Sequence, residues 1–169
     1  LGGVTAAGFS GVDSNLFLAS KMTMRGQDIG FVGKIEQVNT TLISICKQNS
    51  IVPVISPISR DNNGAIYNVN ADLAASELAM ALEADDLIFV SDVPGVLIND
   101  EVKKEIRTSE IEDLIARGHI TGGMIPKLRS AAEAVHRGVG RVHICGWRGS
   151  ETLHNELSTS TSTGTVIHR

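Results

Sequence analysis

Lys127 lies in the first turn of a predicted helix, shortly after the glycine pair Gly122 and Gly123. A helix N-terminus carries partial positive charge, so a lysine there is mildly unfavourable unless an anion binds beside it. Backbone amides around the two glycines, the helix dipole and the ammonium group could converge on phosphate oxygens. The segment therefore suggests phosphate binding. The alternative, a solvated lysine whose stem covers apolar surface, has about equal weight.

A second candidate segment, residues 68–72 with the sequence NVNAD, closes a turn and opens another predicted helix. An acid such as Asp72 in the first turn of a helix is favourable for structural reasons alone. Asn68 and Asn70 add amide donors and acceptors beside that carboxylate, although a turn and a helix cap would explain them equally well. Together with Lys127, the segment gives the hypothesis of a site that handles a phosphoryl group.

The elements that would position these residues alternate between strands and helices. Apolar runs at 51–55 and 86–90 predict strands buried on both faces, and apolar residues spaced three and four apart over 71–82 predict a core-facing helix. This alternation indicates a largely parallel sheet, in which ligands bind beyond the carboxyl ends of the strands. The loop 92–97, which follows the strand at 86–90, is therefore a candidate nucleotide site.

The start of the chain has a different pattern. Residues 1–38 are rich in glycine and contain short β-type runs, which predict antiparallel hairpins, and the internal Gly33 suits a hairpin or bulge. Further helices are expected over 40–48, 109–117, 126–138 and 150–157, strands over 141–145 and 166–167, and a loop over the Ser/Thr run 158–163.

Composition excludes several classes of protein. The 169 residues suffice for one domain with a buried core, and 15 Lys plus Arg against 19 Asp plus Glu give no general attraction for nucleic acid or anionic lipid. Cys46 and Cys145 match neither a metal-ligand spacing nor a disulfide framework, and no apolar run is long enough to span a membrane. We therefore expect a cytoplasmic protein that binds neither nucleic acid nor membrane and has no metal site built from its own side chains.

The common catalytic fingerprints do not occur in the sequence. It contains no phosphate loop of the Walker type, no Gly-x-Gly-x-x-Gly fingerprint and no nucleophile elbow, and its five histidines are scattered. Any chemistry must therefore rest on the lysine, the carboxylate and the amides described above.

Taken in order, four segments closely resemble the acetylglutamate kinases, which are arginine-biosynthesis members of the amino acid kinase family. These segments are residues 54–58, 68–72, 91–97 and 120–127, with hairpin-like stretches at 8–13 and 30–33 and a last strand at 164–165. The resemblance implies an α/β fold, a three-layer αβα sandwich with a largely parallel central sheet, plus N-terminal β-hairpins. Residues 1–66 would then be the remainder of the acetylglutamate-binding half, and residues 67–169 the nucleotide-binding half, of a single partial domain.

The same resemblance implies transfer of the γ-phosphoryl group of ATP to the side-chain carboxylate of N-acetyl-L-glutamate. Lys127 would stabilise the moving phosphoryl group, Asp72 would orient the catalytic lysines, and Asn68, with Asn70 nearby, would hold the acetylglutamate. Because a carboxylate acceptor is already ionised, this chemistry needs no general base. Mg²⁺ would be held mainly by the phosphates of the nucleotide. The nucleotide site would comprise Asp92, Val93, Pro94, Gly95, Val96, Leu97, His119, Ile120, Thr121, Gly122 and Gly123.

The sequence also departs from the family pattern. The N-terminal Lys-x-Gly-Gly segment, the His-Gly-Gly-Gly loop and the substrate-binding arginine of these kinases have no counterpart here. We therefore expect the first third of the family's length to be absent, and Asp72 to lack one of the lysines it would organise. A catalytically incomplete nucleotide-binding or regulatory module is the alternative, as is another amino acid kinase such as a uridylate or carbamate kinase. A homo-oligomer, or association with the missing N-terminal segment, would cover the sheet edge and apolar surface left open.

Overall fold

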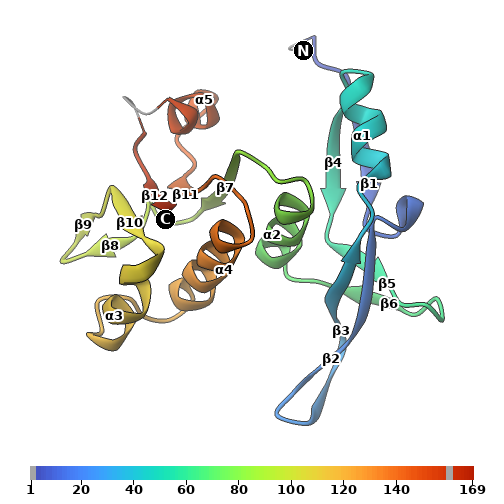
Figure 1. Cartoon of the computed structure of the whole chain (residues 1–169), viewed down its shortest axis with the longest axis horizontal. Coiled ribbons are helices and arrows are strands. Elements are labelled where there is room, and N and C mark those ends of the chain that lie inside the picture. The colour runs from blue at the N-terminus through green and yellow to red at the C-terminus, as the bar shows by residue number, and fades with distance from the viewer. Residues whose placement is uncertain (1–2, 159–161) are drawn as a thin grey trace. The chain divides into compact units, whose positions relative to one another are not determined.

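The computed structural model describes residues 3–158 and 162–169, and the chain divides into two compact units, Leu1–Leu82 and Glu83–Arg169 (Figure 1). This boundary reflects packing and places the whole helix at 71–81 in the first unit. The functional halves predicted on either side of residues 66 and 67 stay a prediction.

The first unit contains a parallel pair of strands and a small barrel. Strand β1 (Ala6–Ser10) pairs in parallel with β4 (Val52–Ser56), and helix α1 (Thr41–Gln48) packs against β4 through its buried face. The closed barrel has the order β2-β3-β6-β5 and follows a short 3₁₀ turn over Asp13–Asn15. Its strands are β2 (Phe17–Met24), β3 (Gln27–Val38), β5 (Ile58–Arg60) and β6 (Ile66–Asn68).

The hairpin prediction for the first residues is correct in one part and wrong in another. Strands β2 and β3 form a long antiparallel hairpin, so a hairpin that includes Gly33 is confirmed, and the register of the pair shifts between Lys21 and Thr23, next to the Lys21–Gly33 pair. Strand β1, in contrast, does not belong to a hairpin, because its partner β4 lies more than forty residues away and runs parallel. A short apolar run shows that a strand will form, but its pattern does not reveal which distant strand completes the ladder.

Helix α2 (Ala71–Ala81) starts where the sequence predicts. The backbone amide of Leu73 donates to Oδ1 of Asn70 at 3.1 Å, so Asn70 caps the helix and satisfies one of its unpaired amides. The buried face of α2 includes Ala74, which joins the core of the first unit. That core comprises Leu16, Phe17, Ile35, Ile43, Val69 and Ala74.

Replacing Asn70 by alanine should lower the free energy of unfolding by about 1 kcal/mol, because the Leu73 amide loses its acceptor at the helix terminus. Urea denaturation followed by circular dichroism measures the change. Asn70→Asp is the matched control, since a carboxylate oxygen can replace the amide oxygen and should retain most of the stability. Equal losses in the two variants would show that the cap contributes nothing.

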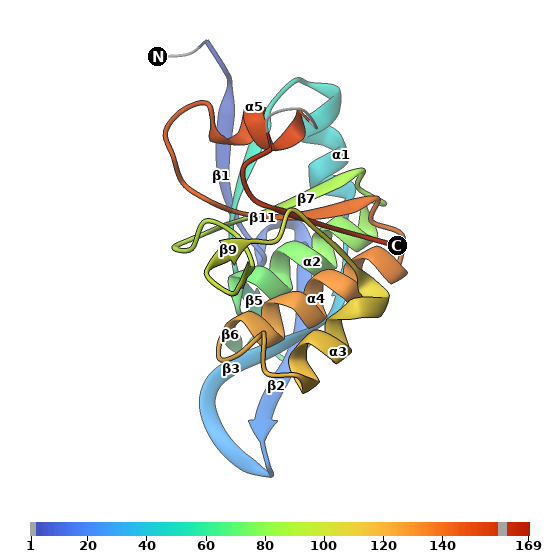
Figure 2. The ribbon, with the colours of Figure 1, turned by 90° about the vertical axis from the view of Figure 1, so that its left-hand side faces the viewer.

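The second unit is a three-layer sandwich. Its sheet has the order β10-β12-β11-β7, in which β7 and β11 are parallel, β11 and β12 antiparallel, and β12 and β10 parallel. Helix α5 (Thr152–Leu157) lies on one face of this sheet, and helix α4 (Met124–His136) lies on the other (Figure 1, Figure 2). The strands are β7 (Asp86–Ser91), β10 (Glu105–Arg107), β11 (Arg141–Gly146) and β12 (Thr165–His168). The predicted α/β class with an αβα arrangement is therefore confirmed.

Some element boundaries differ from the prediction. Helix α4 begins at Met124, so Pro126 is its third residue rather than its first. Proline is tolerated there because the amides of the first helical turn have no partner within the helix. A hairpin of β8 (Leu97–Ile98) and β9 (Glu101–Val102) precedes β10, and a 3₁₀ turn (Thr108–Glu110) precedes α3 (Ile111–Ala116). Of the Ser/Thr run predicted as a loop, residues 159–161 lie outside the described residues.

Candidate nucleotide and phosphoryl-transfer site

Two predicted nucleotide-binding segments come together in the second unit. A pocket of about 180 Å³ lies between the loop that follows β7 and the segment that precedes α4. Seven of the eleven residues predicted for the nucleotide site line it, together with Met124. These seven are Val93, Gly95, Val96, Leu97, His119, Ile120 and Thr121. The pocket thus lies at the carboxyl end of β7, as expected for a ligand site in an α/β sheet.

The loop after β7 is held close to neighbouring strands. Val96 is buried, and its carbonyl oxygen accepts a hydrogen bond from the amide of Lys103 at 2.9 Å. At Gly95, a Cβ atom would lie 2.9 Å from both Oγ1 of Thr165 and Cγ1 of Val102. The loop can therefore take this path only because residue 95 has no side chain.

The segment before α4 also depends on a glycine. Gly122 has a φ of +57°, in the left-handed region that side chains with a Cβ rarely adopt. This turn directs the chain into α4, whose first residues are Met124 and Ile125. The helix therefore begins directly after the glycine pair, two residues before the predicted start at Pro126.

Lys127 extends from the first turns of α4 over the aromatic ring of Phe89. Its Nζ atom lies 5.0 Å from the ring centroid, within range of a cation–π interaction. Phe89 lies on β7, two residues before that strand ends and the loop 92–97 begins. The structure therefore places the ammonium group near the carboxyl end of β7, on the helix that the pocket segment leads into.

Asn68, Asn70 and Asp72 belong to the first unit, whereas Lys127 and the nucleotide pocket belong to the second. Asn68 ends β6 and pairs with both Val32 and Ile58, and Asp72 lies in the first turn of α2. The arrangement of residues 68–72 at a helix start is confirmed. Their assembly with Lys127 into one site stays a prediction.

Replacing Gly95 by alanine should weaken binding of ADP by about tenfold, because the new methyl group forces the loop away from Thr165 and Val102. Isothermal titration calorimetry on the purified chain measures the affinity. Gly8→Ala is the control, since a Cβ at Gly8 meets no atom within 4 Å. Unchanged affinity in the Gly95 variant would show that the loop conformation is irrelevant to the nucleotide.

Sequence reasoning missed a second cavity in the same unit, of about 370 Å³. At its wall His143 is buried between two carboxylates: Nε2 lies 3.1 Å from Oδ1 of Asp86, and Nδ1 lies 4.0 Å from Oε2 of Glu156. In the part of the chain that the structure describes, Nδ1 has no hydrogen-bond partner. A histidine between Val142 and Ile144 in a buried strand was the available signal. The cavity is lined by Lys104, Glu105, Arg141, His143, Glu156, Ser162, Val166 and His168.

Among residues 3–158 and 162–169, no three His, Cys, Asp or Glu residues gather in a way that could hold a metal ion. No helix in these ranges is both long and apolar enough to cross a membrane.

Residues 2–146 match the amino acid kinase family. An acetylglutamate kinase from Chlorobium chlorochromatii is 42% identical over 163 residues, and one from Hydrogenobaculum sp. is 43% identical over 164 residues; each alignment covers 96% of this chain. A carbamate kinase from Giardia lamblia, solved bound to AMP-PNP, matches 82% of the chain and 52% of its own, with a TM-score of 0.63 and 28% identity.

The chain belongs to the amino acid kinase family. The resemblance to the acetylglutamate kinases, drawn from the four sequence segments, is confirmed at about 40% identity. The chain spans 57% of the length of each of these two relatives.

Proposed function

We propose that the chain supplies the nucleotide-binding part of an acetylglutamate kinase, which transfers the γ-phosphoryl group of ATP to the side-chain carboxylate of N-acetyl-L-glutamate in arginine biosynthesis. The observation that carries the proposal is the convergence of residues 93–97 and 119–121 on one pocket beside β7, with Lys127 on the adjoining helix. The identity to two acetylglutamate kinases supports the choice of acceptor.

In this proposal, catalysis consists of positioning and charge stabilisation. The acceptor carboxylate attacks the γ-phosphorus, the bond from phosphorus to the β,γ-bridging oxygen breaks, and ADP leaves with that electron pair. The Lys127 ammonium group would neutralise charge on the moving phosphoryl oxygens, and Asp72 would orient lysines around the phosphates. Asn68 and Asn70 would bind the acetylglutamate through their side-chain amides. Oδ1 of Asn70 already accepts the hydrogen bond from the Leu73 amide that caps α2. Gly122 and Gly123, with Asp92 and Pro94, would complete the nucleotide site.

Magnesium fits this site as an ion held mainly by the nucleotide. The described residues offer no cluster of three ligands, and Mg²⁺ commonly relies on substrate phosphates with few carboxylates. When bound, the ion neutralises charge on the phosphate oxygens. The protein's own part is then to bind the nucleotide and to aim Lys127 at its γ-phosphate.

One exposed apolar face, on the β1–β4 pair, indicates where a protein partner would bind. On the face of the β1–β4 pair that carries Val52 and Val54, these side chains are 48% and 60% exposed, although parallel sheets are normally covered on both faces. We propose that the remaining length of an acetylglutamate kinase, or a second copy of the chain, covers this face. The compartment in this proposal is the cytoplasm, in keeping with two free buried cysteines, Cys46 and Cys145.

The test joins the chain to the portion of the Chlorobium relative that it does not span, measures ADP release with each acceptor, and detects acyl phosphate by trapping with hydroxylamine. Turnover should require ATP and N-acetyl-L-glutamate, and uridylate or carbamate in place of acetylglutamate should give none. Preference for uridylate or carbamate would identify another amino acid kinase. Binding of ATP without turnover by the joined protein would favour a regulatory nucleotide-binding module.

A further inference from the structure

We propose that Thr165 is a positioning residue for the nucleotide pocket, which holds the loop 93–97 through the backbone amide of Val96. This inference rests on the proposed function of the pocket. Thr165 is absent from the pocket lining, so its effect on a nucleotide would be transmitted by the loop alone.

One buried hydrogen bond joins the two segments. The Val96 amide donates to Oγ1 of Thr165 at 2.8 Å, across 69 residues of sequence, and both residues are almost fully buried. A buried amide whose acceptor is removed must move or stay unpaired, and either outcome is costly. Because Val96, Gly95 and Leu97 line the pocket, a shift of this amide changes the shape of the wall that a nucleotide would contact.

The loop also lies unusually close to Thr165. A Cβ at Gly95 would lie 2.9 Å from Oγ1 of Thr165 and 3.3 Å from its backbone nitrogen. Glycine at position 95 thus allows the loop to come close to Thr165. At this distance the Thr165 hydroxyl can accept the hydrogen bond from the Val96 amide.

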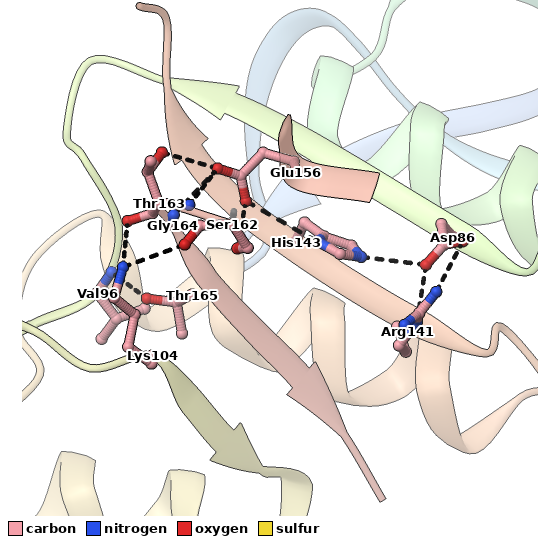
Figure 3. A network of polar contacts seen from close by, with 10 residues as sticks. All are labelled: Asp86, Val96, Lys104, Arg141, His143, Glu156, Ser162, Thr163, Gly164 and Thr165. Atoms are coloured by element: carbon pink, nitrogen blue, oxygen red, sulfur yellow. Dashed lines mark hydrogen bonds and ion pairs between the residues drawn. The ribbon is translucent and has the colours of Figure 1, made fainter. Parts of the chain in front are cut away.

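Thr165 is itself fixed by the residues before it (Figure 3). Oε1 of Glu156 accepts hydrogen bonds from the amides of Thr163 and Gly164, at 2.9 and 3.1 Å. From the other side, Nζ of Lys104 donates to the carbonyl oxygens of Ser162 and Thr163, at 3.2 and 3.1 Å. Hydrogen bonds to both the backbone amides and the carbonyl oxygens therefore hold the turn that leads into β12. They fix the Thr165 hydroxyl in the position from which it accepts from the Val96 amide.

Gly164 adds a steric reason for this fixed geometry. A Cβ at Gly164 would clash with the carbonyl oxygen of Ile144 and with Cys145, so the turn packs directly on β11. The position of the Thr165 hydroxyl is therefore fixed relative to the sheet of the second unit. Its hydrogen bond to the Val96 amide fixes the loop 93–97 in turn. Pre-organised contacts of this kind reduce the ordering cost of ligand binding.

The test compares three variants of the full chain with the wild type. Thr165→Val keeps the shape but loses the acceptor, Thr165→Ser keeps the hydroxyl, and Thr23→Val is a matched control that removes an exposed threonine hydroxyl on β2. Calorimetry with ADP measures affinity, and hydrogen exchange at the Val96 amide reports the bond directly. We expect Thr165→Val to bind ADP about tenfold more weakly and to exchange faster at Val96. Thr165→Ser and Thr23→Val should stay within about twofold of the wild type.

Each other outcome overturns the proposal in a recognisable way. Wild-type affinity in Thr165→Val would refute the role of Thr165 while leaving the nucleotide site intact, whereas failure of the wild type to bind ADP would refute both. If Thr165→Val does not fold by circular dichroism, Thr165→Ala takes its place as the variant without a hydroxyl. Unfolding of both, or equal losses in Thr165→Val and Thr165→Ser, would mean that the residue acts only on stability.

Discussion

Replacing Lys127 by alanine should lower kcat by about 10²- to 10³-fold in the joined protein, because the proposed role of its ammonium group is to stabilise developing charge. The proposed reaction has no general base to lose, so charge stabilisation would carry a large share of the catalysis. Stability should change little. The cation–π contact with Phe89 contributes about 0.5–1 kcal/mol at a partly exposed site.

Steady-state kinetics with varied ATP and acetylglutamate separates this role from simple binding. A group that acts in the transition state lowers kcat and kcat/KM together, whereas a group that only binds ATP raises KM at constant kcat. Lys47→Ala, at an exposed position on α1, controls for the loss of a lysine as such. A drop in melting temperature of many degrees with normal kcat would show that Lys127 is structural.

The sequence predicted segments that line one pocket because each of these segments is local. The loop 92–97 and the segment 119–123 each follow from signals in a few adjacent residues, namely a buried strand that ends in a turn and a glycine pair before a helix. Their meeting in space follows from the rule that ligands bind at the carboxyl ends of the strands.

The parts that the sequence did not predict depend on distant contacts. The parallel pairing of β1 with β4 joins segments more than forty residues apart, and the bond from Val96 to Thr165 spans 69 residues. A threonine at the first position of a short strand has no pattern that marks it as an acceptor for a distant loop. The buried position of Glu156 was missed for the same reason, since one glutamate in a six-residue helix reads as a solvated side chain.

Glu156 also gives the strongest prediction about stability. The residue is 1% exposed, and its carboxylate accepts four hydrogen bonds from the turn before β12: from Ser162 Oγ, from the Thr163 amide and hydroxyl, and from the Gly164 amide. Replacing it by glutamine exchanges one acceptor oxygen for a donor, so part of this set must break. We expect the free energy of unfolding to fall by about 2–3 kcal/mol.

The same carboxylate should make stability depend on pH in acid. Burial raises the pKa of Glu156, but the hydrogen bonds from Ser162, Thr163 and Gly164 outweigh it, so its pKa in the folded protein lies below the ordinary 4.5. A carboxyl whose pKa is lowered by folding stabilises the protein when ionised. That contribution is present above about pH 4.5 and is lost as the pH falls through the folded value.

Urea denaturation between about pH 3 and 7 measures both effects, with a slope of about 1.4 kcal/mol per pH unit for each proton taken up. Asp86 also has a lowered pKa, because its hydrogen bonds to Arg141 and His143 outweigh the effect of burial, so the wild type and Glu156→Gln share its acid sensitivity. The difference between the two curves therefore isolates Glu156, and it should be largest at neutral pH and shrink below about pH 4.5. Glu151→Gln, at an exposed position just before α5, should follow the wild-type curve throughout. Parallel curves for wild type and Glu156→Gln would mean that the Glu156 carboxylate holds the turn no better when charged than when neutral.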